Sequence, residues 1–374
     1  MVYDVAIVGT GENPEETSKD GYAMAYRHAP GYQRLDNCNV VACADIVPEN
    51  AEAFAEHFDV DHVFEDHEEM LSAVEPDIVS VCVPPGVHAD IVCDCAESGV
   101  VQAIHCEKPM AKTWADCQRM ADTCREHGVQ LTIDHQRRFG DPFRKAKSLL
   151  EDGEIGDLER IEFSEVNLFD AGSHVFDLCG YYTNQKPVEW VLAQVDYHEE
   201  NIWFGAHNEN QALAQWRYEN GVYGLASTGE GSDFIGSYVR LIGSDGAIEI
   251  GVEDGPTMRM RQGGSWQSID VGDTIHGPGT RLVDEVAAKI PFGQKLVPSQ
   301  TTFYERAIED LVGALETGRE PELTASNALQ ATELVFACWE SARQRGRVEL
   351  PLEIEDNPLE SMVESGDLQP APAE

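Results

Sequence analysis

The stretch VAIVGTGENPEETSKDGYAM, from Val5 to Met24, decides the fold of the first part of the chain. An apolar strand runs into Gly9-Thr10-Gly11, where glycines allow a tight turn and a close approach of backbone to a pyrophosphate. A dinucleotide fingerprint requires its third glycine soon afterwards, but the next one here is Gly21. We interpret the intervening polar residues as a loop added to the turn, with Gly21 beginning the following helical segment.

The pattern up to about residue 135 repeats this strand-and-helix unit. Short apolar segments rich in β-branched residues alternate with amphipathic ones, which is typical of a parallel sheet covered on both faces. We therefore predict a doubly wound, Rossmann-like α/β domain over residues 1–135. The predicted strands lie at residues 3–9, 39–45, 77–84, 100–106 and 129–135.

A different pattern follows, and it indicates a second domain of α+β type over residues 136–352. Several strands have an antiparallel pattern, with Asn220-Gly221 and Asp245-Gly246 as hairpin turns. Helices are predicted at residues 142–153, 171–183, 304–318 and 325–346. Residues 353–374 are acidic, contain prolines and lack periodicity, which predicts a mobile tail.

The charge of the chain excludes several classes of partner. With 68 acidic and 26 basic residues, its formal net charge is −42, which repels nucleic acid and anionic lipid. Molar salt screens such repulsion, so we predict a protein of a high-salt cytoplasm rather than an acidic protein of an ordinary one. No apolar run has the length of a membrane span and no secretion signal is evident.

The ten cysteines lie mostly in apolar segments, as free thiols of a reducing cytosol do. Cys93 and Cys95 have no second pair at zinc-finger spacing, so we interpret them as structural. The sequence therefore predicts no metal site.

Asp45 ends the second predicted strand, where a carboxylate can accept a hydrogen bond from a ribose 2′-hydroxyl. The same carboxylate would repel a 2′-phosphate, which favours NAD while leaving NADP possible. Gly9 and Gly11 alone are weak evidence, because turns use glycine everywhere. Together with the strand, the helix and Asp45, they favour a cofactor site over an ordinary turn.

Lys108 lies in the segment HCEKPM, at the carboxyl end of a buried strand, where ligands of open α/β sheets bind. Burial or a neighbouring positive nicotinamide ring would bring its pKa into a range useful for proton transfer. The alternative is a surface lysine paired with Glu107.

Asp170 and His174 are four residues apart in NLFDAGSHVFD, so on a helix they share one face. A carboxylate beside an imidazole suits proton handling near a substrate hydroxyl. The alternative is that Asp170 is a helix N-cap and His174 belongs to the first turns. Asp177 is assigned to packing or to a cap network rather than to the site.

Basic residues are frequent in HQRRFGDPFRKAK, although the chain as a whole is strongly acidic. We predict that Arg137 or Arg138, at the domain junction, contacts substrate hydroxyl or carboxylate groups; the alternative is a solvated helix face. His88, at the start of the helix after the third predicted strand, either lines the cofactor cleft or caps the helix.

Taken together, these motifs resemble the Gfo/Idh/MocA family of oxidoreductases, named for glucose–fructose oxidoreductase and inositol dehydrogenase. The resemblance spans nearly the whole chain and rests on the segments VCVPPGVHAD, CEKPMA, HQRRF, LEDGEIGDLERI, DAGSHVFDL, LIGSDGAIEI and ESARQRGRVELPL. It implies a Rossmann domain followed by an α+β domain with an open, mostly antiparallel sheet, whose exposed face makes dimer or tetramer contacts.

The resemblance also implies an activity, the transfer of a hydride between a sugar or cyclitol hydroxyl carbon and nicotinamide. It assigns Lys108, Asp170 and His174 to catalysis, and Gly9, Gly11 and Asp45 to cofactor binding. To the predicted cofactor site we add Gly21, Pro84, His88 and Glu107. Two alternatives stay open: an NAD-retaining glycoside hydrolase of the same fold, and a non-enzymatic sensor of nucleotide or sugar.

Overall fold

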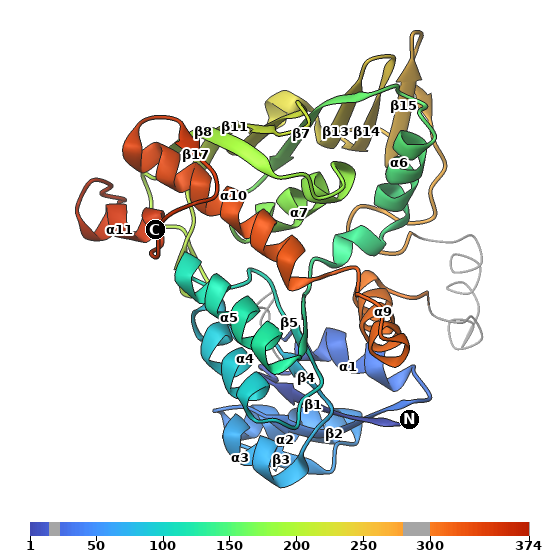
Figure 1. The fold of residues 1–374 in the computed structure, drawn as a ribbon, viewed down its shortest axis with the longest axis vertical. Helices are drawn as coiled ribbons and strands as arrows, with labels where there is room; N and C mark the ends of the chain where they lie inside the picture. The colour runs from blue at the N-terminus through green and yellow to red at the C-terminus, as the bar shows by residue number, and fades with distance from the viewer. Residues whose placement is uncertain (15–22, 280–299, 374) are drawn as a thin grey trace.

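The computed structural model of the protein describes residues 1–14, 23–279 and 300–373. Its N-terminal part contains a six-stranded sheet of order β3-β2-β1-β4-β5-β6, in which every neighbouring pair is parallel (Figure 1). The strands are β1 (Tyr3–Val8), β2 (Cys38–Ala44), β3 (His62–Phe64), β4 (Ile78–Val81), β5 (Ala103–Cys106) and β6 (Gln130–Ile133). The predicted doubly wound sheet is confirmed. The short edge strand β3 was not predicted, because three residues are too few to show a strand pattern.

Helices cover both faces of this sheet because the strands are apolar on both sides. Val5 and Ile78 pack with Tyr32 on one face, whereas Ala6 and Val79 pack with Met70 on the other. The helices are α1 (Ala25–Gln33), α2 (Pro48–Phe58), α3 (His67–Val74), the short 3₁₀ helix η1 (Pro85–Val87), α4 (His88–Glu97) and α5 (Trp114–His127).

The second domain is built on a nine-stranded sheet of order β16-β15-β14-β13-β7-β12-β11-β8-β17. Only β7 and β12 pair in parallel; the other pairs are antiparallel. Its strands are β7 (Leu158–Glu165), β8 (Val188–Asp196), β11 (Gln211–Tyr218), β12 (Tyr223–Gly229), β13 (Ser237–Gly243), β14 (Gly246–Val252), β15 (Met258–Gln262), β16 (Gln267–Ser268) and β17 (Val348–Glu349). Both predicted hairpins form, joining β11 to β12 and β13 to β14.

Helices pack on one face of the large sheet, between it and the first domain (Figure 1). Phe163 of the sheet meets Phe176 of α7 at a ring distance of 5.0 Å, and both are buried. The remaining elements are η2 (Gln136–Phe139), α6 (Asp141–Glu151), α7 (Gly172–Tyr182), the hairpin β9 (Ile202–Trp203) and β10 (Ala206–His207), η3 (Ser232–Ile235), α9 (Phe303–Thr317), α10 (Ala325–Gln344) and α11 (Pro358–Glu364).

Helix α9 differs from its predicted place in the second domain. It packs against α1 of the Rossmann sheet, where Ile308 joins the core formed by Tyr3 and Val5. A side chain at Gly31 of α1 would lie 2.7 Å from the Ile308 Cδ1 atom, so the close approach of the two helices requires glycine. The Rossmann core is thus completed by a segment from late in the chain, which amphipathic periodicity alone does not assign to a domain.

The C-terminal segment also differs from the prediction, because residues 353–374 contain helix α11. Asn357 caps this helix, accepting hydrogen bonds from the backbone N–H groups of Leu359 and Glu360. Leu359 and Met362 are buried, and Asp356 pairs with Arg343 of α10 at 2.5 Å. Within the described part of the chain, no helix combines the length and apolar character needed to cross a lipid bilayer.

Candidate active site

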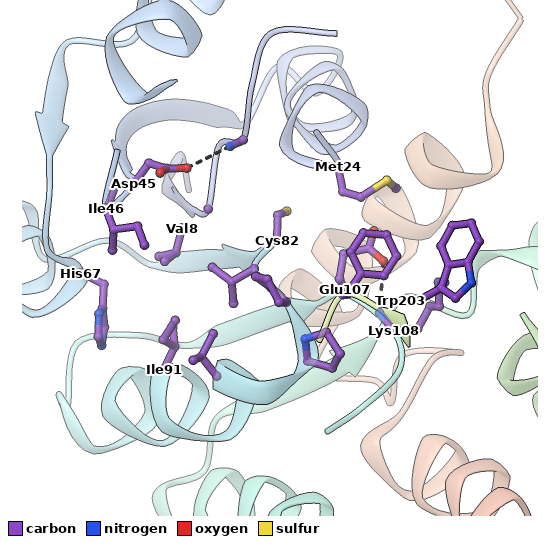
Figure 2. Close-up of a pocket in the computed structure, with 18 of the residues that line it drawn as sticks. Val8, Met24, Asp45, Ile46, His67, Cys82, Ile91, Glu107, Lys108 and Trp203 are labelled. Carbon is purple, nitrogen blue, oxygen red and sulfur yellow. Dashed lines mark hydrogen bonds between the residues drawn. The ribbon is translucent and has the colours of Figure 1, made fainter. Parts of the chain in front are cut away.

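A cavity of about 1000 Å³ runs from the glycine turn of β1 to the face of the second domain. Figure 2 shows Asp45, Ile46 and His67 at one end, and Lys108 and Trp203 at the other. The cavity is lined by residues from both domains, so its two ends can hold two parts of one ligand or two ligands in contact.

The glycine turn forms as predicted from its residue types. Gly9 and Gly11 have φ angles of +85° and +68°, which only glycine adopts readily. A Cβ atom on Gly9 would lie 2.5 Å from Cγ1 of Val83, so the turn is packed against the end of β4. Gly21 lies outside the described residues.

Asp45 holds this turn in place. Its Oδ2 accepts hydrogen bonds from the Gly11 backbone N–H at 2.9 Å and from the Thr10 hydroxyl at 3.1 Å. Glu65 and Asp66 also line this end of the cavity, so the local charge is negative. The turn, the carboxylate and the apolar side chains of Ile46 and Ile91 fit a nucleotide whose ribose carries hydroxyls rather than a phosphate.

Lys108 follows β5 and crosses to the second domain. Its Nζ donates hydrogen bonds to Oδ1 of Asp170 at 2.7 Å and to the Asp170 carbonyl at 3.1 Å. Glu107 stays on the first domain, where its Oε2 accepts the Lys108 backbone N–H at 3.1 Å. The side chains of Lys108 and Glu107 therefore do not form the surface pair that was the alternative prediction.

His174, on the first turn of α7, lines the same cavity as Lys108. Burial, and then the positive charges of Arg137 and Lys108, lower the pKa of His174 well below its ordinary value. Its Nδ1 has no hydrogen-bond partner among the described residues. The imidazole is therefore neutral at neutral pH, with one ring nitrogen unpaired among the described residues.

The predicted pairing of Asp170 with His174 on one helix face is not observed. Asp170 precedes α7, and its carboxylate is bound to Lys108 instead. The physical reason is that the ammonium from the other domain is the stronger partner of a half-buried carboxylate. Asp170 is not the N-cap either, since that position belongs to Ala171.

The two arginines at the domain junction have different places. Arg137 lines the cavity and pairs with Glu165 at 3.2 Å. Arg138 is buried and donates to both carboxylate oxygens of Asp177, at 2.5 and 2.7 Å. The geometry thus leaves Arg137 rather than Arg138 able to meet a substrate, and places Asp177 in a buried ion pair with Arg138.

The segment after β4 contains the two remaining predicted cofactor residues. Pro84 lines the cavity, but His88 does not. His88 is buried, with Nε2 2.7 Å from the Val83 carbonyl and Nδ1 3.1 Å from the Pro109 carbonyl. Its imidazole therefore connects the two loops that follow β4 and β5. The sequence analysis did not predict this role, because it depends on a contact with Pro109, which is distant in the sequence.

Several lining residues were not found from the sequence. They are Met24, Gln136, Trp203, Phe204, His276, Phe303 and Tyr304. Trp203 belongs to the tip of the β9–β10 hairpin, with its side chain 45% exposed. An aromatic pair beside glycine in NIWFGAH was the available signal, because exposed aromatics on a turn indicate a binding surface.

The loop carrying Asp170 is held from behind by a buried carboxylate that the sequence did not suggest. Oε1 of Glu209 accepts the Leu168 backbone N–H at 2.7 Å, and Oε2 accepts the Trp339 indole N–H at 3.0 Å. The neighbouring Asn208 accepts the Asp170 backbone N–H at 3.3 Å. Burial raises the pKa of Glu209 to about 7.

Comparison with known families agrees with this architecture. Residues 4–135 match the model of the Gfo/Idh/MocA oxidoreductase family described as an NAD-binding Rossmann fold. Residues 160–350 match the model of that family's C-terminal alpha/beta domain. The chain belongs to the Gfo/Idh/MocA family of oxidoreductases. Its first domain is the NAD-binding domain of that family.

Among curated relatives, 2,7-anhydro-N-acetylneuraminate hydratase of Mediterraneibacter gnavus is 27% identical over 68% of this chain and 69% of its own length. D-apiose dehydrogenase of Paraburkholderia graminis is 24% identical over 91% of this chain and 90% of its own. Two further relatives, uncharacterized oxidoreductases of Bacillus subtilis and Streptococcus pneumoniae, are matched over only 51% and 63% of their own length. Aldose-aldose oxidoreductase of Caulobacter crescentus shares the fold, with a TM-score of 0.72 at 20% identity, over 94% of this chain and 100% of that one.

Proposed function

We propose that this family member is an NAD-dependent dehydrogenase that acts on a hydroxyl-bearing carbon of a sugar or polyol. The observation that carries the proposal is the meeting of Lys108, Asp170 and His174 in the cavity that begins at the glycine turn. Relatives named D-apiose dehydrogenase and inositol 2-dehydrogenase support a polyhydroxylated substrate.

The residues of the cavity fit roles in alcohol oxidation. When bound, NAD supplies the hydride acceptor. His174, neutral and buried, accepts the hydroxyl proton. The Lys108 ammonium, oriented by Asp170 at 2.7 Å, donates a hydrogen bond to the substrate oxygen and stabilises the negative charge that develops there. Arg137 and Trp203 are placed to contact other parts of the substrate.

The charge of the nucleotide end supports NAD over NADP. Asp45, Glu65 and Asp66 line this end, where His67 is already paired with Asp94 at 3.0 Å. A 2′-phosphate would therefore meet more carboxylate than positive charge. Hydroxyls of an unphosphorylated ribose would instead find acceptors.

The test is a screen of sugars, sugar acids and cyclitols for NADH formation in molar KCl, with NADP as comparison. We expect absorbance at the NADH band with at least one polyol and NAD, and loss of this signal in Lys108→Ala. Lys112→Ala is the matched control, because Lys112 pairs with Glu360 outside the cavity. Failure of every polyol with NAD, in protein shown to bind NAD, would contradict the proposal.

A reaction without net oxidation is the second candidate, favoured because one relative is named a hydratase. The same proton-handling groups serve a transient oxidation that is reversed before release. Conversion of an anhydrosugar or glycoside without accumulation of NADH would select this candidate, as would deuterium exchange at one sugar carbon.

We also propose that the protein forms a homodimer or homotetramer through the open face of its large sheet. Leu192, Leu213 and Tyr223 are between 37% and 52% exposed on this face, on strands β8, β11 and β12. Light scattering in molar KCl is expected to give a multiple of the chain mass. Leu213→Asp is expected to reduce it to one chain, and a wild-type monomer would contradict the proposal.

A further inference from the structure

Four ionisable side chains gather behind Lys108, on the side away from the cavity's substrate end. His28 comes from α1, His105 from β5, Glu107 from the loop after β5, and Asp134 from the end of β6. His28, His105 and Asp134 are fully buried and Glu107 is 5% exposed. The catalytic arrangement described above uses none of these side chains.

Only part of this cluster is hydrogen-bonded: His28 Nε2 lies 3.1 Å from Glu107 Oε1. Both carboxylate oxygens of Asp134 and Nε2 of His105 have no hydrogen-bond partner among the described residues. The shortest approaches are 3.5 Å from Asp134 Oδ2 to His28 Nε2 and 3.6 Å from Asp134 Oδ1 to His105 Nε2. A buried carboxylate without a hydrogen bond is strongly unfavourable, so a positive charge must satisfy it, either a protonated His28 or a bound cation.

The tautomer of His105 can be read from its other nitrogen. The Thr132 hydroxyl donates to the Ile104 carbonyl at 3.2 Å, so its oxygen accepts from His105 Nδ1 at 2.8 Å. The proton is therefore on Nδ1, and Nε2 presents a lone pair to Asp134. His28 likewise has Nδ1 2.9 Å from the Ser80 hydroxyl, leaving Nε2 to the cluster. Hydroxyl partners on Nδ1 are how proteins orient metal-binding histidines.

His28, His105 and Asp134 each bring one ligand atom within 4.8 Å of the others, and three separations in the cluster are close to those around one ion. Bonds of about 2.1 Å in a tetrahedral zinc site place neighbouring ligand atoms about 3.4 Å apart. Here the separations are 3.1 Å from Glu107 Oε1 to His28 Nε2, and 3.5 and 3.6 Å to Asp134. A water molecule bridging two of them at normal hydrogen-bond lengths would hold them about 4.5 Å apart.

We propose that His28, His105, Glu107 and Asp134 bind one divalent transition-metal ion, with Zn²⁺ the best match. Two imidazole nitrogens and two carboxylates are a donor set for zinc, whereas Mg²⁺ and Ca²⁺ prefer oxygen alone. Two carboxylates neutralise the ion's charge, as a buried site requires. The sequence analysis predicted no metal site because the ligands are spread over 106 positions, from His28 to Asp134. No spacing rule detects such a set.

The ion would have a structural role close to Lys108. It would join α1, β5 and β6 at the point where Glu107 accepts the backbone N–H of Lys108. Glu107 also lines the cavity, which gives the ion a route of entry. Loss of the ion is therefore expected to loosen the loop that carries Lys108.

The experiment uses untagged full-length protein, stripped with a chelator, incubated with ZnCl₂ in 2 M KCl and separated by gel filtration. The high salt displaces cations held weakly by the acidic surface. Mass spectrometry is expected to find about one zinc per chain in the wild type, and a large loss in His105→Gln and Asp134→Asn. His67→Gln is the matched control, because His67 belongs to a part-exposed group with Glu68 and Asp94, and it is expected to keep the zinc.

Three results would overturn the proposal: wild-type protein without retained zinc, equal loss in His67→Gln, or full retention in Asp134→Asn. If the buried substitutions prevent folding, the Co²⁺-loaded wild type decides. A four-coordinate site gives strong visible absorption, whereas cobalt bound only at the acidic surface gives the weak spectrum of the hydrated ion. A crystal structure of zinc-treated protein with only water between these side chains would also refute it.

Discussion

The ammonium of Lys108 and the carboxylate of Asp170 lie 2.7 Å apart across the boundary between the two domains. Lys108 follows β5 of the first domain, and Asp170 lies just before α7 of the second. Both side chains are 18% exposed, so the pair is screened only in part by solvent. The relative position of the domains therefore sets the geometry of this pair, and the ion pair in turn helps to hold the domains together.

Removal of the lysine charge tests this pair. Lys108→Met is expected to lower kcat by about 10²–10⁴-fold, the range for a positioned acid or base, because the substrate oxygen loses its positive partner. NAD binding, followed by quenching of tryptophan fluorescence, is expected to persist because the glycine turn is untouched. A variant with wild-type kcat would show that Lys108 has no part in turnover.

The pH dependence of activity is expected to reflect the low pKa of His174. Because burial and nearby positive charge lower this pKa well below its ordinary value, the imidazole stays neutral as the pH falls through the ordinary histidine pKa. We expect kcat/KM in the wild type to show no acidic fall at the ordinary histidine pKa of about 6.5. His174→Gln is expected to lose about 10²–10⁴-fold in kcat.

His198 provides the control for that substitution, since it is exposed at the surface away from the cavity. His198→Gln is expected to keep both kcat and the pH profile. An acidic limb centred near pH 6.5 in the wild type, absent from His174→Gln, would indicate a base with an unshifted pKa and contradict the burial argument.

Cofactor preference is expected to follow the carboxylate of Asp45. Asp45→Ser removes a negative charge beside the ribose and should improve kcat/KM for NADP relative to NAD by about tenfold, or ~1.4 kcal/mol. The gain is limited because Glu65 and Asp66 remain. Asp122→Ser, at an exposed site on α5, is the control. An unchanged NADP/NAD ratio in Asp45→Ser would remove Asp45 from cofactor selection.

Local signals predicted much of the fold. Gly128 ends α5 in the left-handed conformation with φ +71°, and the Asn220-Gly221 turn joins β11 to β12, because these features depend on neighbouring residues alone. The glycine turn, Asp45 and Lys108 were found for the same reason, since each has a fixed place at the end of a strand.

What could not be predicted depends on contacts between distant segments. Arg138 was a substrate candidate until its partner was known, and that partner is Asp177, 39 residues away. The pairing of Asp170 with Lys108 rather than His174 spans 62 residues. Helix α11 was missed although Asn357-Pro358 is a normal helix start, because its acidic composition indicated a tail.

Stability is expected to depend on pH through Glu209. Its folded-state pKa is raised to about 7 from 4.5, so the folded protein binds a proton that the unfolded chain releases. The stability this contributes is complete below pH 4.5 and is lost as pH rises towards 7, by about 3 kcal/mol in total. Glu209→Gln cannot ionise, so its free energy of unfolding should lack this slope.

Chemical denaturation from pH 5 to 8 measures the difference between the two proteins. Glu159→Gln, at an exposed position of β7, is expected to follow the wild type. Glu209→Gln is also expected to lower kcat, because its amide oxygen alone cannot accept from Leu168, Trp339 and the Thr228 hydroxyl, and Asp170 then loses part of its support. Parallel pH profiles for wild type and Glu209→Gln would show that Glu209 stays ionised.

Salt is expected to stabilise the protein because of its net charge of −42. At low ionic strength the carboxylates repel one another across the folded surface, whereas at 1 M salt the screening length is about 3 Å. We expect the Tm to rise between 0.1 and 2 M KCl by about 5 °C or more, since each kcal/mol shifts the Tm by about 2–4 °C in domains of this size. Sorbitol at matched osmolality should not reproduce the rise, because it does not screen charge. A Tm that is constant or falls with KCl would contradict adaptation to a high-salt cytoplasm.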